Sequence, residues 1–403
     1  MALGDKKNTY LIGIKGVGMT ALAQILKSRG IGVMGSDTDE KFFTDEVLDK
    51  LGIEVIENFS EGNISPDIDL VIRSQAYTKE NNIEVFEAEK RGVDIITYPE
   101  ALAELFNSSY GIAVCGTHGK STTSAMLGFI LEKAGFDPTV VVGSRINEWG
   151  SNARAGNSKY FVIEADEYKS AFLRYKPKMI ILTNIDFDHP DAFKNENEYR
   201  KVFEKFMSDN NEAKLIDGRN IEIKDFNLKL PGAYNLENAT LAYRAALSLG
   251  VEKSKAVEAL EGFGGLARRF ESYGEYRGAL LYDDYAHHPT EIRAVLKGAK
   301  QKYPGKKIIA LFQPHTYSRT EALFGEFIDA LEGADEVYIL KTYGSAREEG
   351  EDTSGKNLAD KLNTKYFQTH KDAAEFIKNK LNKDVLFLAL GAGDGWEVLK
   401  LLN

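Results

Sequence analysis

The stretch GIAVCGTHGKSTT (residues 111–123) decides the fold. Its first residues are the small apolar run of a strand buried on both faces, and TTSAMLGFILEKAG (122–135) continues it as a helix that ends at glycine. A glycine turn that closes with Gly-Lys-Ser between a strand and a helix is the context of a phosphate loop. In such a loop the backbone N–H groups bind phosphate, Lys120 neutralises it, and the Ser121 hydroxyl is suited to ligate Mg²⁺.

The loop departs from the usual pattern at one position, because Val114 stands where the first glycine would fall. A tight strand-to-helix turn without a ligand is the alternative interpretation, but Gly-Lys-Ser at such a junction favours a phosphate site. We expect Cys115 to be a small buried residue and not a nucleophile. It is the single cysteine of the chain, which excludes an intramolecular disulfide and a thiolate metal cluster.

On both sides of this stretch, short apolar runs alternate with helical segments, a pattern that predicts an α/β fold with parallel sheets. The predicted strands form three sets: 9–14, 31–36, 69–74 and 94–98; 111–116, 139–144, 160–165 and 179–184; 279–284, 307–312, 336–341 and 385–390. Further helices are predicted at 19–30 and 235–250. A polar break at 107–109 and a glycine-rich stretch at 262–265 separate the sets. We therefore expect three α/β domains: a Rossmann-like domain at 1–108, a phosphate-loop domain at 109–264 and a second Rossmann-like domain at 265–403.

The composition excludes several classes of protein. The 403 residues are 43% hydrophobic and 28% charged, which is typical of a folded chain of two or three domains. The formal net charge of −10 argues against a nucleic-acid partner, since no local basic patch offsets it. The N-terminal residues lack the apolar core of a signal peptide and no run reaches 18 apolar residues. We expect no membrane segment, a cytoplasmic location, and a monomer or homodimer.

A second glycine loop, Gly13-Ile14-Lys15-Gly16-Val17-Gly18-Met19, follows the first predicted strand. Glycines at this place let the backbone approach a diphosphate at the N-terminus of the next helix. Since the spacing is G-x-x-G-x-G and the dinucleotide fingerprint is G-x-G-x-x-G, a tight turn is the alternative. Asp37, about 20 residues further on, is placed to accept from a ribose hydroxyl.

Acidic side chains end two predicted strands downstream of the phosphate loop. YFVIEADEY ends in Glu164, Asp166 and Glu167, and MIILTN continues to Asp186-Phe187-Asp188-His189. Carboxylates at the carboxyl end of a strand beside a phosphate loop predict a Mg²⁺ site, with solvated loop acids and helix caps as the alternative. A histidine ligand is unusual for Mg²⁺, which prefers oxygen.

The third set of strands has polar motifs at its ends: Arg268-Arg269-Phe270-Glu271, Asp283–Pro289 and Gln313–Arg319. An arginine pair at an interdomain joint is either surface charge or a group that stabilises a transferring phosphoryl group. His287 and His288 cannot both point one way from a strand, so we reject a two-histidine metal clip. We interpret them as a strand end that passes into the start of a helix.

In this order, and together with Asn235–Asn238 and the closing Gly391–Trp396, the motifs resemble those of the Mur ligases of peptidoglycan synthesis over nearly the whole chain. Within that family, Gln313-Pro314-His315 with Arg319 is most similar to the alanine-adding members. The resemblance implies an ATP-dependent ligase that joins L-alanine to the carboxylate of UDP-N-acetylmuramate through an acyl phosphate and releases ADP and phosphate. A murein tripeptide ligase of cell-wall recycling is the alternative within the family. A dehydrogenase would need the G-x-G-x-x-G spacing with a proton-relay group near it, and neither is evident. A nucleotide-dependent sensor would leave the motifs of the third domain unexplained.

The resemblance also implies roles for individual residues. The UDP-sugar would bind to Lys15, Gly16, Val17, Gly18, Met19, Ser36, Asp37, Ser74 and His118. ATP would bind to Gly116, Thr117, Gly119, Lys120, Ser121, Thr122, Asn235, Asn238, Arg269 and Asp284. Mg²⁺ would bind to Ser121, Glu164 and His189, and the amino acid to Tyr285, His287, His315 and Arg319. The catalytic set would be Lys120, Glu164, His189, Arg269 and His287.

Three features depart from the family pattern. Lys15 stands where a glycine is common, and Thr316 stands where many relatives have arginine. The polar stretch 191–229 is shorter than its counterpart, and we expect it to form one amphipathic helix and a short peripheral hairpin. Since every implied substrate is anionic or zwitterionic, we also expect a cleft made basic by Lys15, Lys120, Arg269 and Arg319.

Overall fold

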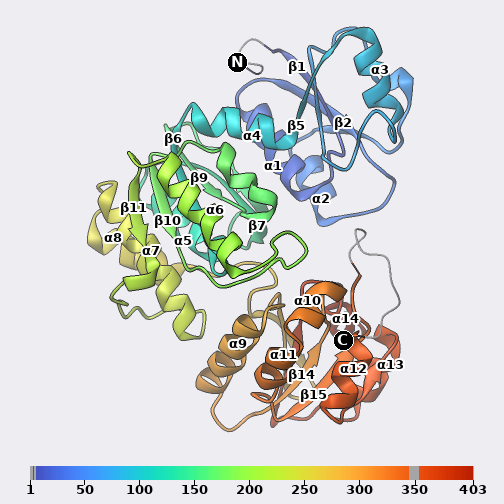
Figure 1. The fold of residues 1–403 in the computed structure, drawn as a ribbon, viewed down its shortest axis with the longest axis vertical. Coiled ribbons are helices and arrows are strands. Elements are labelled where there is room, and N and C mark those ends of the chain that lie inside the picture. The colour runs from blue at the N-terminus through green and yellow to red at the C-terminus, as the bar shows by residue number, and fades with distance from the viewer. Residues whose placement is uncertain (1–2, 4–5, 345–353, 403) are drawn as a thin grey trace.

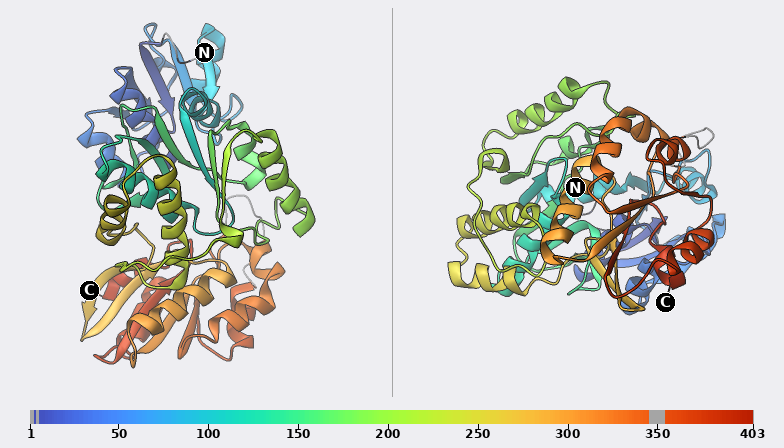
Figure 2. Two further views of the ribbon diagram at one scale, coloured as in Figure 1. Left: turned by 90° about the vertical axis from the view of Figure 1, so that its left-hand side faces the viewer. Right: turned by 90° about the horizontal axis from the view of Figure 1, so that it is seen from below.

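The computed structural model describes residues 3, 6–344 and 354–402. In this part of the chain three sheets follow one another, each with helices on both faces, which confirms the predicted three-domain α/β fold. Figure 1 shows the first sheet at the top of the molecule, the second in the middle and the third at the bottom, and the left view of Figure 2 shows the same order from another side. Residues 1–2 and 4–5, part of the segment in which we expect no signal peptide, lie outside the described residues. No helix among the described residues is long and apolar enough to cross a membrane.

The first sheet has five parallel strands in the order β3-β2-β1-β4-β5. They are β1 (Asn8–Ile12), β2 (Gly32–Ser36), β3 (Glu54–Ile56), β4 (Leu70–Arg73) and β5 (Asp94–Thr97). The helices are α1 (Val17–Ser28), α2 (Phe43–Lys50), α3 (Ile83–Arg91) and α4 (Tyr98–Asn107). The first glycine loop therefore lies between β1 and α1, at the carboxyl edge of a central strand, where α/β sheets bind their ligands.

The second sheet has six strands in the order β11-β10-β6-β9-β7-β8, all parallel except the β7–β8 pair. They are β6 (Tyr110–Cys115), β7 (Thr139–Ile146), β8 (Ser151–Arg154), β9 (Tyr160–Glu164), β10 (Met179–Leu182) and β11 (Lys214–Asp217). The helices are α5 (Lys120–Lys133), α6 (Glu196–Asp209), α7 (Ala233–Ser248) and α8 (Lys253–Gly262). Every residue of α5 from 121 to 131 is buried, because the helix packs between the sheet and helices α7 and α8.

The third sheet has six strands in the order β12-β13-β17-β14-β15-β16, all parallel except the β12–β13 pair. They are β12 (Glu271–Tyr276), β13 (Ala279–Asp284), β14 (Lys307–Phe312), β15 (Glu336–Leu340), β16 (Tyr366–Phe367) and β17 (Val385–Leu390). The helices are α9 (Pro289–Lys302), α10 (Tyr317–Ala322), α11 (Phe324–Leu331), α12 (Ser354–Lys361), α13 (His370–Lys378) and α14 (Glu397–Leu402). As expected, the histidine pair connects a strand to a helix: the His288 ring accepts from the N–H of Thr290 and caps α9.

The stretch 191–229 differs from the prediction. It contains the expected amphipathic helix, α6, but the expected hairpin is wrong. Strand β11 pairs in parallel with β10 and becomes an edge of the central sheet. A hairpin needs two antiparallel runs from the same stretch, whereas β11 finds its partner in a strand more than thirty residues earlier in the chain.

Candidate active site

The phosphate loop has the predicted strand–turn–helix geometry. Gly119 caps α5 at φ +81°, and a Cβ at this position would come within 2.2 Å of Asn238 Oδ1, so only glycine fits. The first N–H groups of α5 have no partner within the helix and form the positive end of its dipole. A loop of this shape is suited to bind phosphate oxygens.

The segment after β10 holds the phosphate loop in place. Thr183 Oγ1 donates to the carbonyl of His118 at 2.7 Å, and Asn184 both donates to that carbonyl and accepts from the His118 N–H. Thr117 Oγ1 donates to the carbonyl of Asp186 at 2.7 Å and accepts from its N–H at 2.9 Å. The loop after β6 and the segment after β10 belong to separate motifs in the sequence, and in the structure these hydrogen bonds join them into one unit.

Lys120 is the cation of the loop. Its Nζ donates to the carbonyls of Gly116 (2.7 Å) and Thr117 (3.0 Å) and to Glu167 Oε2 at 2.9 Å. Burial by itself would lower the pKa of Lys120, but the carboxylates of Glu167, Asp166 and Glu164 together outweigh it and raise that pKa. Glu167 is fully buried and also accepts from the Tyr199 hydroxyl. The ammonium group is therefore charged at neutral pH and fixed beside the loop.

The predicted metal ligands lie along one wall of a cleft next to Lys120. Ser121 Oγ donates to Glu164 Oε1 at 2.9 Å. His189 lies beside other acids: its Nε2 is 3.7 Å from Glu167 Oε1, and ligand atoms of Asp166, Glu167 and His189 lie within 4.8 Å of one another. The predicted set is therefore divided: Ser121 pairs with Glu164, whereas His189 groups with Asp166 and Glu167. The hydroxyl and the carboxylates are oxygen donors that fit Mg²⁺.

A pocket between α7 and α9 brings together six of the residues assigned to ATP: Gly119, Thr122, Asn235, Asn238, Arg269 and Asp284. Its remaining wall includes the apolar side chains of Leu230, Ala294 and Val295, which suit the faces of a base. The pocket begins at the phosphate loop, so a nucleotide with its base here would have its phosphates at Lys120.

Asp284 lies at the floor of this pocket. Its carboxylate accepts from the N–H groups of Phe270 and Ala286, each at 2.8 Å. Burial raises the pKa of Asp284 to about 7, against the opposing effect of Arg269.

The cleft beside the pocket is lined by all three domains. Its lining includes Val17 and Gly18 from the first domain, Lys120 and Ser121 from the second, and Tyr285 and His287 from the third. Arg269 lines both the pocket and the cleft. Its buried Nε has no hydrogen-bond partner among the described residues, although its guanidinium lies over the Tyr285 ring. A buried donor left open between two cavities is available to a ligand.

The four residues assigned to the amino acid lie together. The ring centroids of Tyr285 and His287 are 5.2 Å apart, and those of His287 and His315 are 6.2 Å apart. Burial lowers the pKa of His287 to about 3, so the ring is neutral. Arg319 donates through Nε to Asp188 Oδ1 at 2.8 Å. Burial alone would raise the pKa of Asp188, but the guanidinium holds it well below its usual range.

Lys15 is placed differently from the expectation. Its side chain is 1% exposed, and Nζ donates to Glu57 at 2.8 Å and lies 3.2 Å from Asp45. Burial would lower the pKa of Lys15, but these two carboxylates outweigh it and raise it. Neither Lys15 nor Arg319 lines the cleft, so the predicted basic cleft loses two of its four cations. A lysine is accommodated at this position, where a glycine is common, because its charge is neutralised inside the first domain.

The nine residues assigned to the UDP-sugar are divided, because only some of them line the cleft. Val17, Gly18 and His118 line the cleft. The remaining six do not: Lys15, Gly16, Met19, Ser36, Asp37 and Ser74. Met19 is packed in the core, Ser36 is fully buried and donates to Glu84, and Asp37 accepts from the N–H groups of Lys15 and Thr38. The structure therefore gives several of them local contacts that shape the glycine loop.

Sequence reasoning missed two side chains that support the site, Tyr199 and Glu291. It named Glu167 and Asp188 only as acids of a predicted Mg²⁺ site, whereas in the structure they pair with Lys120 and Arg319. The sequence does contain a signal for Glu291. This residue follows His287 by four residues at the start of a helix, and this spacing puts both side chains on one face. Tyr199 had none, since an aromatic residue in an amphipathic helix is ordinarily core.

Three family models match successive parts of the chain. Residues 8–110 match the Mur ligase family catalytic domain, 114–217 the Mur ligase middle domain, and 268–393 the glutamate ligase domain of Mur ligases. A UDP-N-acetylmuramate–L-alanine ligase of Desulfitobacterium hafniense is 38% identical, in an alignment that covers 96% of this chain and 98% of that protein. The chain belongs to the Mur ligase family. The family predicted from the motifs is thereby confirmed.

Two solved structures of ligases are similar in fold to this Mur ligase. The crystal structure of the UDP-N-acetylmuramate–alanine ligase MurC of Thermotoga maritima matches with a TM-score of 0.80 and 28% identity, over 98% of both chains. A murein peptide ligase of Psychrobacter arcticus matches with a TM-score of 0.69 and 23% identity, also over 98% of both chains, which shows a shared fold. The tripeptide ligase alternative is therefore not favoured.

Proposed function

We propose that this Mur ligase joins L-alanine to the carboxylate of UDP-N-acetylmuramate at the expense of ATP, in the biosynthesis of peptidoglycan. The observation that supports it most is the cleft, at which the first glycine loop, the phosphate loop and the Tyr285–His287 pocket meet. Three substrates require three adjacent subsites, and each domain contributes one. The curated relatives of 38% and 36% identity bear the name of this activity.

The chemistry explains why a phosphate loop is needed. A free carboxylate does not acylate an amine at neutral pH, because oxide would have to leave. Transfer of the γ-phosphoryl group of ATP to the carboxylate gives an acyl phosphate, and ADP departs. The amine of alanine then attacks the acyl carbon, and phosphate leaves from the tetrahedral intermediate. Such a reaction depends on positioning and on charge neutralisation more than on an enzyme nucleophile.

The residues of the site suit these tasks. Lys120 and the N–H groups of α5 neutralise and orient the phosphates, and Arg269 supplies a guanidinium donor where the nucleotide pocket opens into the cleft. His287 Nδ1 lies 3.0 Å from the carbonyl of Tyr285, which makes Nδ1 the protonated nitrogen and leaves Nε2 as an acceptor for the amino group of alanine. Ser121, Glu164 and His189 would hold Mg²⁺, which supplies additional charge neutralisation at the phosphates when bound.

A phosphate-release assay tests the proposal. With ATP and UDP-N-acetylmuramate present, we expect release with L-alanine and much less with glycine, L-serine or the murein tripeptide. Release without any amine, or with the tripeptide alone, would refute it. The variant Lys120→Ala should lose phosphate release by about 1,000-fold or more, while calorimetry shows UDP-sugar binding within a few-fold of wild type.

The same proposal places the enzyme in the cytoplasm, where ATP is supplied. A monomer or homodimer stays a prediction, which size-exclusion chromatography with light scattering would settle.

A further inference from the structure

We propose that Glu291 is a positioning residue of the ligase reaction: it holds Arg269 within the third domain, and it meets His118 only when that domain is docked on the phosphate loop. This inference rests on the proposed function for its kinetic test. Glu291 lies in the first turn of α9, and its side chain is 12% exposed. It lines both the nucleotide pocket and the cleft.

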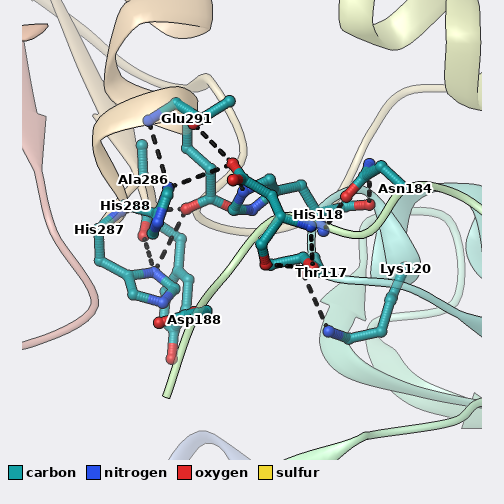
Figure 3. Close-up of polar contacts among 12 residues, drawn as sticks. Thr117, His118, Lys120, Asn184, Asp188, Ala286, His287, His288 and Glu291 are labelled. Atoms are coloured by element: carbon teal, nitrogen blue, oxygen red, sulfur yellow. Dashed lines mark hydrogen bonds and ion pairs between the residues drawn. The ribbon is translucent and has the colours of Figure 1, made fainter. Parts of the chain in front are cut away.

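The Glu291 carboxylate joins three groups of the site. Its Oε1 lies 3.3 Å from His118 Nδ1, in the phosphate loop of the central domain, and 3.7 Å from Arg269 Nη1. Its Oε2 accepts from the N–H of His287 at 3.1 Å. Figure 3 shows Glu291 pointing from α9 across the domain junction towards His118, with His287 on its own side. One side chain thus contacts the phosphate loop, the arginine at the pocket entrance and the predicted amino-acid pocket.

The charge of Glu291 is essential to this arrangement. Burial by itself would raise the pKa of Glu291, but the positive charges beside it, those of His118 and Arg269, lower it well below its usual value. An ionised carboxylate can attract a guanidinium and an imidazolium at the same time, whereas an amide of the same size cannot. Since Arg269 Nε has no partner among the described residues, the contact with Glu291 is the ion pair that orients this guanidinium.

The neighbouring histidines do not make a metal site of this cluster. Ligand atoms of His118, Asp186 and His288 lie within 4.8 Å of one another. However, His118 Nε2 faces Asp186 at 3.1 Å and its Nδ1 faces Glu291. His288 accepts from Thr290 N–H through Nδ1, and its Nε2 faces the carbonyl of Phe187. All four ring nitrogens have protein partners, so the cluster is a set of contacts between two domains.

The contacts explain how docking prepares the site. When α9 lies against the phosphate loop, Glu291 meets His118 and holds Arg269 at the entrance of the nucleotide pocket. If the third domain moved away, Arg269 would move with it, because both residues belong to that domain. A misplacement of about 1 Å at a reacting group can reduce the rate about 100-fold.

Kinetics of Glu291→Gln test the inference. The amide keeps the size of the side chain, so we expect kcat to fall about 10- to 100-fold, with the KM values for ATP and UDP-N-acetylmuramate within about 3-fold of wild type. Glu326→Gln, an exposed acid on α11, is the control and should leave both parameters unchanged. Unchanged kcat in Glu291→Gln, or a loss confined to KM, would overturn the inference.

A double variant tests the partner. If Glu291 acts with His118, the double variant that combines Glu291→Gln with His118→Asn should have a kcat within about 2-fold of that of the worse single variant. Multiplied losses would mean that the two side chains act independently and would contradict the proposed contact.

A distance measurement separates this inference from the proposed function. Cys115 is buried, so spin labels can be placed at Lys253→Cys in the central domain and Lys371→Cys in the third. We expect one dominant distance in wild type with a non-hydrolysable ATP analogue, and a broader, longer distribution in Glu291→Gln. Identical distributions would overturn the role of Glu291. Absence of alanine ligation by the wild type would refute only the proposed function.

Discussion

The two domain junctions of the molecule differ in the chemistry of their contacts, since one is mainly apolar and the other is mainly charged and polar. Between the first and second domains, one apolar cluster continues from the helices of the first sheet into the strands of the second. The Phe106 ring, on α4, is fully buried and contacts the rings of Phe161 and Tyr175 in the central domain. A Cβ on Gly111 would collide with the Phe106 ring at 2.4 Å, which shows how closely this side chain lies on β6.

The junction between the second and third domains is made mainly of charged and polar groups. Asp186 accepts from Thr290, Asp188 accepts from Arg319, and His118 faces Glu291. Among the apolar side chains of the central domain, Tyr234 near the start of α7 packs against the core of the third domain.

This difference indicates which domain moves. Separation of the first two domains would expose apolar surface, at a cost of about 25 cal/mol per Å². Separation of the third domain would return charged groups to water, which solvates them well. We therefore expect the first and second domains to behave as one unit and the third to open and close on them, as a ligase that must exclude water requires.

Replacement of Phe106 by alanine should have the largest effect. Loss of this buried ring should reduce the free energy of unfolding by about 3–5 kcal/mol. Calorimetry should show one shifted transition for the first two domains. If the first domain unfolded separately from an unchanged second domain, the junction would not be the single core that we describe.

Asp188→Asn should have a smaller effect, confined to docking of the third domain. Arg319 would lose its ionic partner, at a cost of about 2 kcal/mol, and opening of the junction would let water solvate the guanidinium. Small-angle scattering should show a larger radius of gyration, with little change in the melting of the first two domains. Asp209→Asn breaks an exposed pair with Lys205 and serves as the control. An unchanged radius would contradict the comparison.

Alkaline pH should weaken docking by a still smaller amount. Burial would lower the pKa of His118, but Asp186 and Glu291 raise it to about 9, and His288 also faces it. Asp186 belongs to the same domain as His118, so only the contact with Glu291 depends on docking. That contribution is complete while the ring is protonated and is lost as pH rises towards about 9. Scattering between pH 6.5 and 9 should show progressive opening, and His118→Asn should abolish that dependence. If the third domain of His118→Asn opened with rising pH as in the wild type, the group that titrates would be a residue other than His118.

The strands that sequence analysis found and missed differ in their surroundings. All twelve predicted apolar runs are strands in the structure. The five that were not predicted, β3, β8, β11, β12 and β16, all lie at sheet edges. An interior parallel strand is buried on both faces and needs a continuous apolar run, whereas an edge strand such as KLID (214–217) is half exposed and depends on its neighbour.

The site shows the same division. Gly119, Lys120 and Ser121 could be predicted because a phosphate loop requires a local sequence. Lys15 could not be placed, since its neutralisation depends on Asp45 and Glu57, some thirty and forty residues further on. Burial and pairing are properties of the folded chain, and no spacing in the sequence encodes them.

The sequence by itself determined the three α/β units, the phosphate loop and the family, because each depends on residues that are neighbours in the chain. The tertiary structure alone decided which charges reach the cleft and which are neutralised. It also decided that Glu291, on the third domain, meets His118 of the second. That contact joins residues 173 positions apart, and only the packing of one sheet domain on another can bring two such charges within 4 Å.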